Sequence, residues 1–213
     1  GGAGATTFAA ALGQVASRHD ATLVVDADAW GPGVDRVLGL EHVDGVGWEQ
    51  LAGSHGRLAA RDLREGVPRR GRLGVLTWRQ AAVPHLPGAE QVAEVLAAAR
   101  RGHDVVVVDL PRLGDSRDQL AAHCDLVVAV VPATVAGVAS SIRAVAGLED
   151  PTRAGLVLRG RGTDELAAQR ATGLPVLATM VSQRGMDEAV DLGLGPVRSF
   201  RGPLGRAAGD VLD

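Results

Sequence analysis

Short runs of apolar residues alternate along the chain with longer segments in which apolar positions recur every three or four residues. The runs are rich in valine and leucine, which is typical of parallel strands buried on both faces. The longer segments have the spacing of helices that cover such a sheet. We predict strands over 22–26, 72–78, 104–110, 125–131, 155–159 and 175–180, and helices over 6–17, 89–101, 116–123, 135–148, 164–172 and 203–212.

This alternation predicts an α/β fold with a doubly wound, mostly parallel sheet. The chain has 213 residues, 46% hydrophobic and 22% charged, which suffices for one core without a metal or disulfide. We therefore interpret residues 1–213 as a single domain, with loops at the glycine- and proline-rich stretches 31–33 and 193–205.

Composition narrows the classes of function. The chain has five aromatic residues and a net charge of −3, which disfavours base stacking and a broad basic surface, so nucleic-acid binding is not expected. The lone cysteine, Cys124, excludes an internal disulfide, and the histidines lack metal-ligand spacing. We find no signal peptide, no membrane-spanning run and no basic amphipathic end, so we expect a cytoplasmic protein that does not insert into membranes.

The sequence GGAGATT over residues 1–7 matches the spacing of the end of a Walker A phosphate loop. In that motif backbone N–H groups surround phosphate oxygens, a lysine neutralises phosphate charge and a hydroxyl reaches Mg²⁺. Here Ala5 stands at the lysine position, and all 22 basic residues of the chain are arginine. Because a phosphate loop follows a strand, we expect that strand upstream of Gly1, in a longer protein of which this chain is a part.

Acidic residues follow two of the predicted strands. Asp26 and Asp28 end the strand 22–26, and Asp109 follows four consecutive valines. Ligands of open α/β sheets bind at the carboxyl ends of strands. In one interpretation Asp28 orients an attacking water, Asp26 helps to hold Mg²⁺, and Asp109 is the Walker B acid. In the other, Asp26 and Asp28 only cap the loop that follows them.

The order of these motifs, GGAGATT, VVDADAWGPGVDRVLGLE and VVVVDLPR, resembles the MinD/ParA/CpaE branch of the P-loop ATPases. The segments 45–52, 74–78 and 109–112 are similar to the actinobacterial CpaE-like group, which includes the septum-site-determining protein Ssd and TadZ-type proteins. The resemblance implies a P-loop NTPase fold of the MinD/ParA type. It covers essentially the whole chain.

The resemblance also implies roles for individual residues. Thr6 and Asp109, with Asp26, would hold Mg²⁺, and Asp28 would orient water if the site is active. The nucleotide-binding loop would consist of Gly2, Ala3, Gly4, Ala5, Thr6 and Thr7.

Two departures from the family pattern alter this site. Ala5 removes the phosphate-loop lysine, and the signature lysine of the branch would precede Gly1. The strand 155–159 ends in Arg159, where relatives carry an asparagine that reads adenine. An arginine cannot accept the adenine amino hydrogen bond. In one interpretation Arg159 or Arg161 approaches the phosphates instead; in the other, which we favour, the two form a solvated surface pair. We expect ATP or ADP with Mg²⁺ to bind weakly or not at all.

Three functions follow from this resemblance. The first is a spatial regulator of septum-site placement or of pilus or secretion apparatus assembly, with a degenerate ATP site and weak or absent hydrolysis. The second is an active Mg-dependent ATPase of the deviant Walker A type, and the third a ParA-like DNA partition protein. The resemblance implies a homodimer, partners in the division or pilus machinery, recruitment by them to the septum or inner membrane face, and a preceding receiver-like domain.

Overall fold

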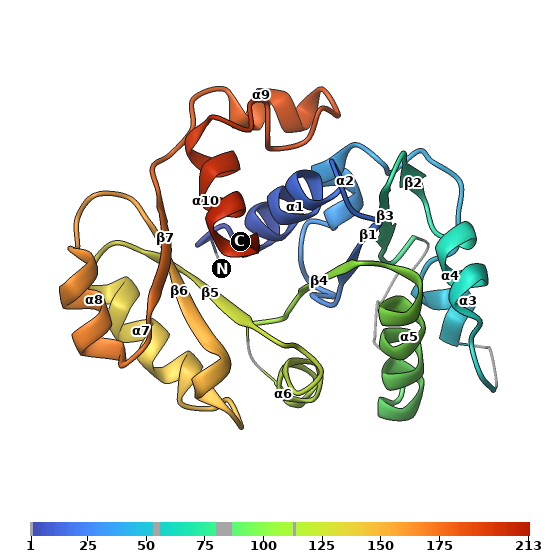
Figure 1. Cartoon of the computed structure of the whole chain (residues 1–213), viewed down its shortest axis with the longest axis horizontal. Coiled ribbons are helices and arrows are strands. Elements are labelled where there is room, and N and C mark those ends of the chain that lie inside the picture. The colour runs from blue at the N-terminus through green and yellow to red at the C-terminus, as the bar shows by residue number, and fades with distance from the viewer. Residues whose placement is uncertain (1, 53–55, 80–86, 113) are drawn as a thin grey trace.

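The computed structural model describes residues 2–52, 56–79, 87–112 and 114–213. Its strands form two sheets (Figure 1). Neighbouring strands are parallel, apart from the antiparallel pair β2 and β3. The first sheet has the order β2 (Arg69–Arg70), β3 (Leu73–Leu76), β1 (Thr22–Asp26) and β4 (Val105–Asp109), and the second has the order β5 (Val127–Pro132), β6 (Ala154–Arg159) and β7 (Val176–Met180).

The structure confirms the predicted α/β class with mostly parallel strands, and each predicted strand and helix occurs within a few residues of its expected bounds. It adds β2, four short helices (α2, α3, α4 and α9) and a 3₁₀ turn that the hydrophobic pattern did not predict. The helices are α1 (Ala5–Ala16), α2 (Val34–Leu38), α3 (Trp48–Ala52), α4 (Ala60–Gly66), α5 (Ala89–Gly102), α6 (Asp115–Ala121), α7 (Val135–Val145), α8 (Glu165–Thr172), α9 (Met186–Asp191) and α10 (Pro203–Leu212), with a 3₁₀ turn at Pro151–Arg153.

Helices cover both faces of the first sheet because successive side chains of a strand point to opposite sides. Leu23 and Val25 of β1 pack in a cluster with residues of α3, α4 and α5. Val24, between them, packs in a different cluster with residues of α1 and α2. Figure 1 shows these two layers on either side of β1.

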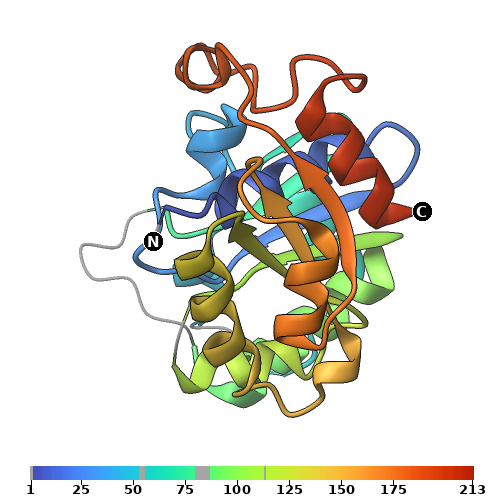
Figure 2. The same ribbon diagram turned by 90° about the vertical axis from the view of Figure 1, so that its left-hand side faces the viewer.

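The second sheet repeats this arrangement. Leu156 and Leu158 of β6 pack with residues of α7 and α8, whereas Val157 packs with residues of α1 and α10. In Figure 2, α7 and α8 lie in front of these strands. Helix α1 therefore contributes to the core on one side of both sheets.

Strand β4 is an edge strand of the first sheet, and β5, the next strand in the chain, is an edge strand of the second. Among the described residues each pairs on one side only, β4 with β1 and β5 with β6. Their valines are mostly half-buried, whereas β1 and β3 are fully buried. The strand expected upstream of Gly1 stays a prediction.

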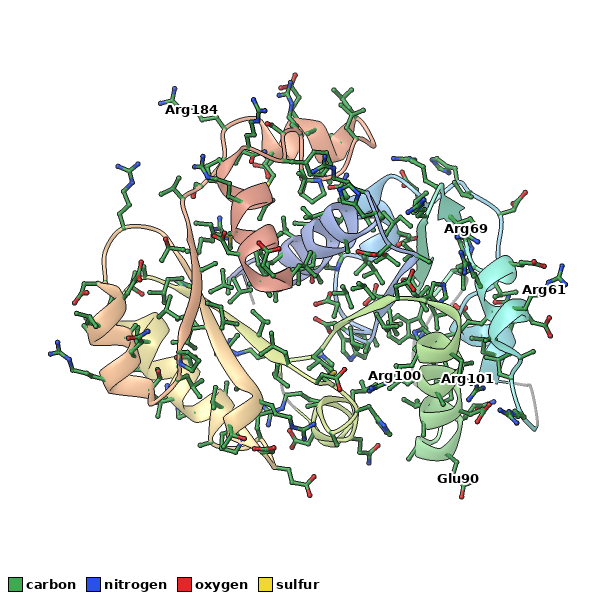
Figure 3. All side chains as sticks on the ribbon, in the orientation of Figure 1. Arg61, Arg69, Glu90, Arg100, Arg101 and Arg184 are labelled. Carbon is green, nitrogen blue, oxygen red and sulfur yellow. The ribbon has the colours of Figure 1, made fainter. Side chains whose placement is uncertain are left out.

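Several arginines are held by ion pairs or hydrogen bonds within the chain. Arg100 and Arg101 of α5 form ion pairs with Asp125 and Glu94 and also bond to backbone carbonyls. Arg69 and Arg70 bond to carbonyls as well. Figure 3 shows Arg69, Arg100 and Arg101 on the side of the molecule that carries α4 and α5.

In the described part of the chain, no helix is long and apolar enough to cross a membrane.

Helix α1 approaches the first sheet most closely at Gly13. A Cβ atom added there would lie 2.4 Å from Cγ2 of Val24 and 3.2 Å from Cδ1 of Leu73. The first distance is far inside van der Waals contact, so any larger residue would push α1 away from β1. Glycine at this position therefore sets the distance between the helix and the sheet.

We expect Gly13→Ala to lower the free energy of unfolding by about 1–3 kcal/mol, because overpacking outweighs the gain in helix propensity. Gly209→Ala in α10 is the matched control, since an added Cβ there meets no atom within 4 Å. That variant should be neutral or up to about 1 kcal/mol more stable. Urea unfolding of the three proteins measures both changes, and an unchanged Gly13→Ala would contradict this account of the packing.

Candidate functional site

The predicted phosphate loop leads directly into α1. Gly2 and Gly4 have φ angles of 95° and 93°, a left-handed backbone that favours glycine. Gly4 is the N-cap of α1, and no side chain caps the helix within the described residues. The N–H groups of the first turn therefore point out of the helix without a side-chain acceptor. Such a helix start attracts anions through these donors and the helix dipole.

The carboxyl group of Asp109 lies beside this helix start. Asp109 is the last residue of β4 and is 3% exposed. The side chain of Thr6 hydrogen-bonds to it, while its Oδ2 atom is buried without a partner in the described structure. Burial raises the pKa of Asp109 to about 7; the Thr6 hydrogen bond opposes this rise, and the charges of Asp26 and Asp28 add to it.

Asp26 is the register partner of Asp109 on β1, so the two acids end adjacent strands. Its Oδ2 accepts hydrogen bonds from the Val34 N–H and the Thr77 hydroxyl, both at 2.9 Å, and its Oδ1 accepts one from the Asp28 N–H at 3.2 Å. Burial raises the pKa of Asp26 to about 6 against the effect of these bonds. Both oxygens thus stabilise the following loop, as the capping interpretation expects. A role for Asp26 in holding Mg²⁺ stays a prediction.

Asp28 lies in the turn after β1 and is half-buried. Its Oδ1 accepts a hydrogen bond from the Trp30 N–H at 3.3 Å, and its carbonyl accepts one from Gly31 at 2.8 Å. The side chain of Trp30 is 82% exposed. This turn keeps Asp28 close enough to Asp109 to affect its pKa. Its proposed role in orienting water is not tested by the geometry.

The oxygen atoms at the start of α1 that could act as metal ligands suit Mg²⁺. Magnesium binds proteins through one or two carboxylates and keeps waters and substrate phosphates as its other ligands. The unpartnered Oδ2 of Asp109 and the Thr6 hydroxyl form such a partial set. No group of three or more His, Cys, Asp or Glu side chains that could hold a metal occurs in the described ranges. A magnesium ion here would therefore need phosphate oxygens to complete its shell.

Arg159 does not lie in a solvated surface pair, so this interpretation of the sequence was wrong for that residue. It is half-buried, and its Nη1 donates to the carbonyls of Gly2 and Ala3 at 3.4 and 3.2 Å. Arg161, two residues further on, is exposed. The error arose because the sequence did not show that the end of β6 reaches residues 2–4 of the loop. Ala5 itself is exposed.

Two residues that support the site, Trp48 and Thr77, entered the sequence analysis only as members of the segments 45–52 and 74–78. Trp48 donates from its indole Nε1 to the backbone carbonyl of Asp26 at 2.8 Å, and its own N–H donates to the carbonyl of Thr77 at 3.0 Å. The Thr77 hydroxyl bonds to the Asp26 carboxylate. A buried tryptophan and a buried threonine thus fix the end of β1 from the side of α3 and β3.

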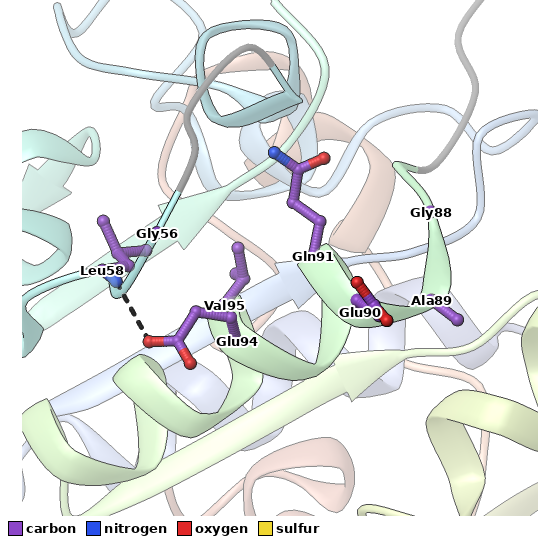
Figure 4. Close-up of a pocket in the computed structure, with 8 residues that line it drawn as sticks. All are labelled: Gly56, Leu58, Gly88, Ala89, Glu90, Gln91, Glu94 and Val95. Carbon is purple, nitrogen blue, oxygen red and sulfur yellow. Dashed lines mark hydrogen bonds between the residues drawn. The ribbon is translucent and has the colours of Figure 1, made fainter.

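A pocket of about 580 Å³ lies apart from these residues, at the start of α5 (Figure 4). Two of its polar side chains, Gln91 and Glu94, hold α5 to neighbouring segments. Glu94 accepts from the Leu58 N–H at 3.0 Å and pairs with Arg101, and Gln91 donates to the carbonyls of Leu51 and Ala52. None of the predicted site residues lines this pocket.

Solved structures that resemble this one include a ParA family ATPase and MinD cell division proteins. A ParA family ATPase from Chlorobium tepidum superposes with a TM-score of 0.86 at 15% identity, over 100% of this chain and 94% of that one. MinD in a MinC:MinD cell division complex from Aquifex aeolicus gives 0.80 at 18% identity, over 99% and 90%. The septum site-determining protein MinD from Pyrococcus horikoshii, complexed with Mg-ADP, gives 0.72 at 19%, over 99% and 90%.

Sequence comparison identifies two uncharacterized proteins from two strains of Mycobacterium tuberculosis. Each is 37% identical over 199 residues, which are 91% of this chain and 55% of the relative. The chain thus spans about half the length of the curated relatives it matches. No family model matches the sequence. Element order, parallel strands and superposition together show that this chain has the α/β fold of the MinD/ParA P-loop ATPases.

Proposed function

We propose that this chain is a spatial regulator of the MinD/CpaE type that binds Mg-nucleotide weakly at a degenerate site. Its proposed task is the placement of the division septum or the assembly of a pilus or secretion apparatus. The main support is one observation: the start of α1 has no side-chain cap and the Asp109 carboxylate beside it has an unpartnered oxygen, as a phosphate and Mg²⁺ site would require, yet position 5 carries an uncharged, exposed alanine. Binding without efficient hydrolysis suits a regulator that responds to nucleotide.

An active ATPase of the deviant Walker A type is the second candidate. It is favoured by the guanidinium of Arg159 at the loop and by Asp28 near Asp109, which would provide a cation and a group to orient water. A DNA partition role has less support, since Arg69, Arg70, Arg100 and Arg101 are held by contacts within the chain.

Assembly belongs to the same proposal. One structural neighbour is MinD in a complex with MinC. We propose that this chain likewise acts through protein partners, as a homodimer that division or pilus machinery recruits to the septum or the inner face of the membrane. Because the loop has no lysine, the electrostatic repulsion between the facing loops of two protomers is weaker. This self-association therefore does not require nucleotide.

We expect Mg-ATP to bind weakly, and Ala5→Lys to raise its affinity about ten- to hundred-fold, because a charge-assisted phosphate contact contributes about 1.5–3 kcal/mol. Ala5 is exposed, so the larger side chain can be accommodated. Calorimetric titration of both proteins with Mg-ATP measures the difference. Ala5→Gln is the uncharged control of similar length and should bind like the wild type. Sub-micromolar binding by the wild type would contradict the proposal.

Substitutions of the two strand-end acids should separate stability from metal binding. Asp26→Asn places an amide against N–H or O–H donors, and should lower the free energy of unfolding by about 1–3 kcal/mol. Asp109→Asn removes a buried charge with an unpartnered oxygen, so it should cost little stability. It should instead abolish the effect of Mg²⁺ on ATP affinity. Urea unfolding and calorimetry with and without EDTA test the pair, and Mg²⁺-dependent binding by Asp109→Asn would exclude Asp109 as the metal ligand.

Hydrolysis of ATP by the wild type should be near background, because each lost transition-state contact costs about two to three orders of magnitude in rate. Asp28→Ala should then change phosphate release little. Single-turnover phosphate release from both proteins at saturating Mg-ATP is the measurement. Robust wild-type turnover that Asp28→Ala abolishes would establish the second candidate, the active ATPase.

A further inference from the structure

The backbone of Arg159 is held firmly where β6 ends. Arg159 is in register with Pro132 of β5 on one side and Met180 of β7 on the other. Its carbonyl accepts a hydrogen bond from the Ala133 N–H at 2.8 Å. The preceding residues of β6 are buried. The side chain thus starts from a fixed point at the carboxyl edge of the second sheet.

From this point the guanidinium reaches the phosphate loop. Nη1 donates to the carbonyls of Gly2 and Ala3 and would lie 3.1 Å from a Cβ atom at Gly4. No other arginine in the described part of the chain hydrogen-bonds to residues 2–7. Because the chain has no lysine, Arg159 is the cation that the fold brings to the loop.

The guanidinium keeps donors for an anion. An arginine has five N–H donors in a planar fork that matches phosphate oxygens. Among the described residues, the hydrogen bonds of Arg159 to the loop use Nη1, so the N–H groups of Nε and Nη2 are available to an anion. Asp109 accepts a hydrogen bond from Thr6 at the start of α1, and Asp26 and Asp28 lie close enough to Asp109 to raise its pKa. These acids would repel a polyphosphate without a cation to offset them.

We propose that Arg159 supplies from β6 the positive charge that position 5 of the loop lacks, and contacts the phosphates of a nucleoside di- or triphosphate bound at the start of α1. This inference rests on the proposed nucleotide site and adds a residue to it. The bonds to Gly2 and Ala3 position the guanidinium beside the loop before a nucleotide arrives.

Calorimetric titration with Mg-ATP and with magnesium pyrophosphate tests this role. Arg159→Gln retains hydrogen-bonding capacity without charge, and should weaken both ligands about ten- to hundred-fold. Arg159→Lys should retain part of the affinity, since it keeps the charge but loses the fork. Arg161→Gln, at the exposed arginine two residues away, is the matched control and should bind like the wild type.

Ala5→Lys in the Arg159→Gln background should restore affinity to at least the wild-type level if the two positions supply the same charge. Thermal unfolding of each apo variant shows whether it is folded. Equal or tighter binding by folded Arg159→Gln would overturn the inference and indicate that Arg159 obstructs the loop. Absence of binding by both the wild type and Ala5→Lys would instead overturn the proposed nucleotide site, and the role of Arg159 with it.

Discussion

Helix α1 packs against the first sheet through Val24 and against the second through Val157, so one helix connects the cores of both. Gly13 allows this helix to approach β1 to a distance that an added Cβ would not permit. The loop at residues 2–4 precedes that helix, and its position relative to Asp109 and Arg159 is therefore set by packing far from the loop itself. A shift of α1 would move the helix start away from both strand ends at once.

The chemistry of the site depends on how charges are distributed over the two sheets. The first sheet contributes acids at the ends of β1 and β4, and the second contributes Arg159 at the end of β6. Asp26 is satisfied by donors of its own loop, whereas one oxygen of Asp109 has no partner in the described structure. These two neighbouring carboxylates thus have different surroundings, which supports the proposal that Asp109 rather than Asp26 is the main ligand of a cation.

The order of strands and long helices could be predicted from sequence because buried valine runs and helical periodicity are local signals. The short helices α2 and α3 could not, since they depend on distant contacts: Asp26 accepts the N–H of Val34, and the Thr77 carbonyl accepts that of Trp48. Motif spacing pointed to the loop, Asp26, Asp28 and Asp109, whose roles stay predictions. Arg159 was misinterpreted, because only the register of β5, β6 and β7 shows which strand end meets the loop.

The proposed use of a strand-end arginine in place of a loop lysine would have a physical consequence for nucleotide binding. A lysine on the loop follows the phosphates wherever the loop moves, whereas Arg159 is anchored to the second sheet. Charge neutralisation then requires that the two sheets keep their relative position, which α1 provides through Val24 and Val157. Under this proposal, nucleotide affinity would be coupled to the packing between the sheets, and a bound polyphosphate would in turn hold the two sheets together. Such coupling would make occupancy of a weak site depend on assembly without requiring rapid hydrolysis.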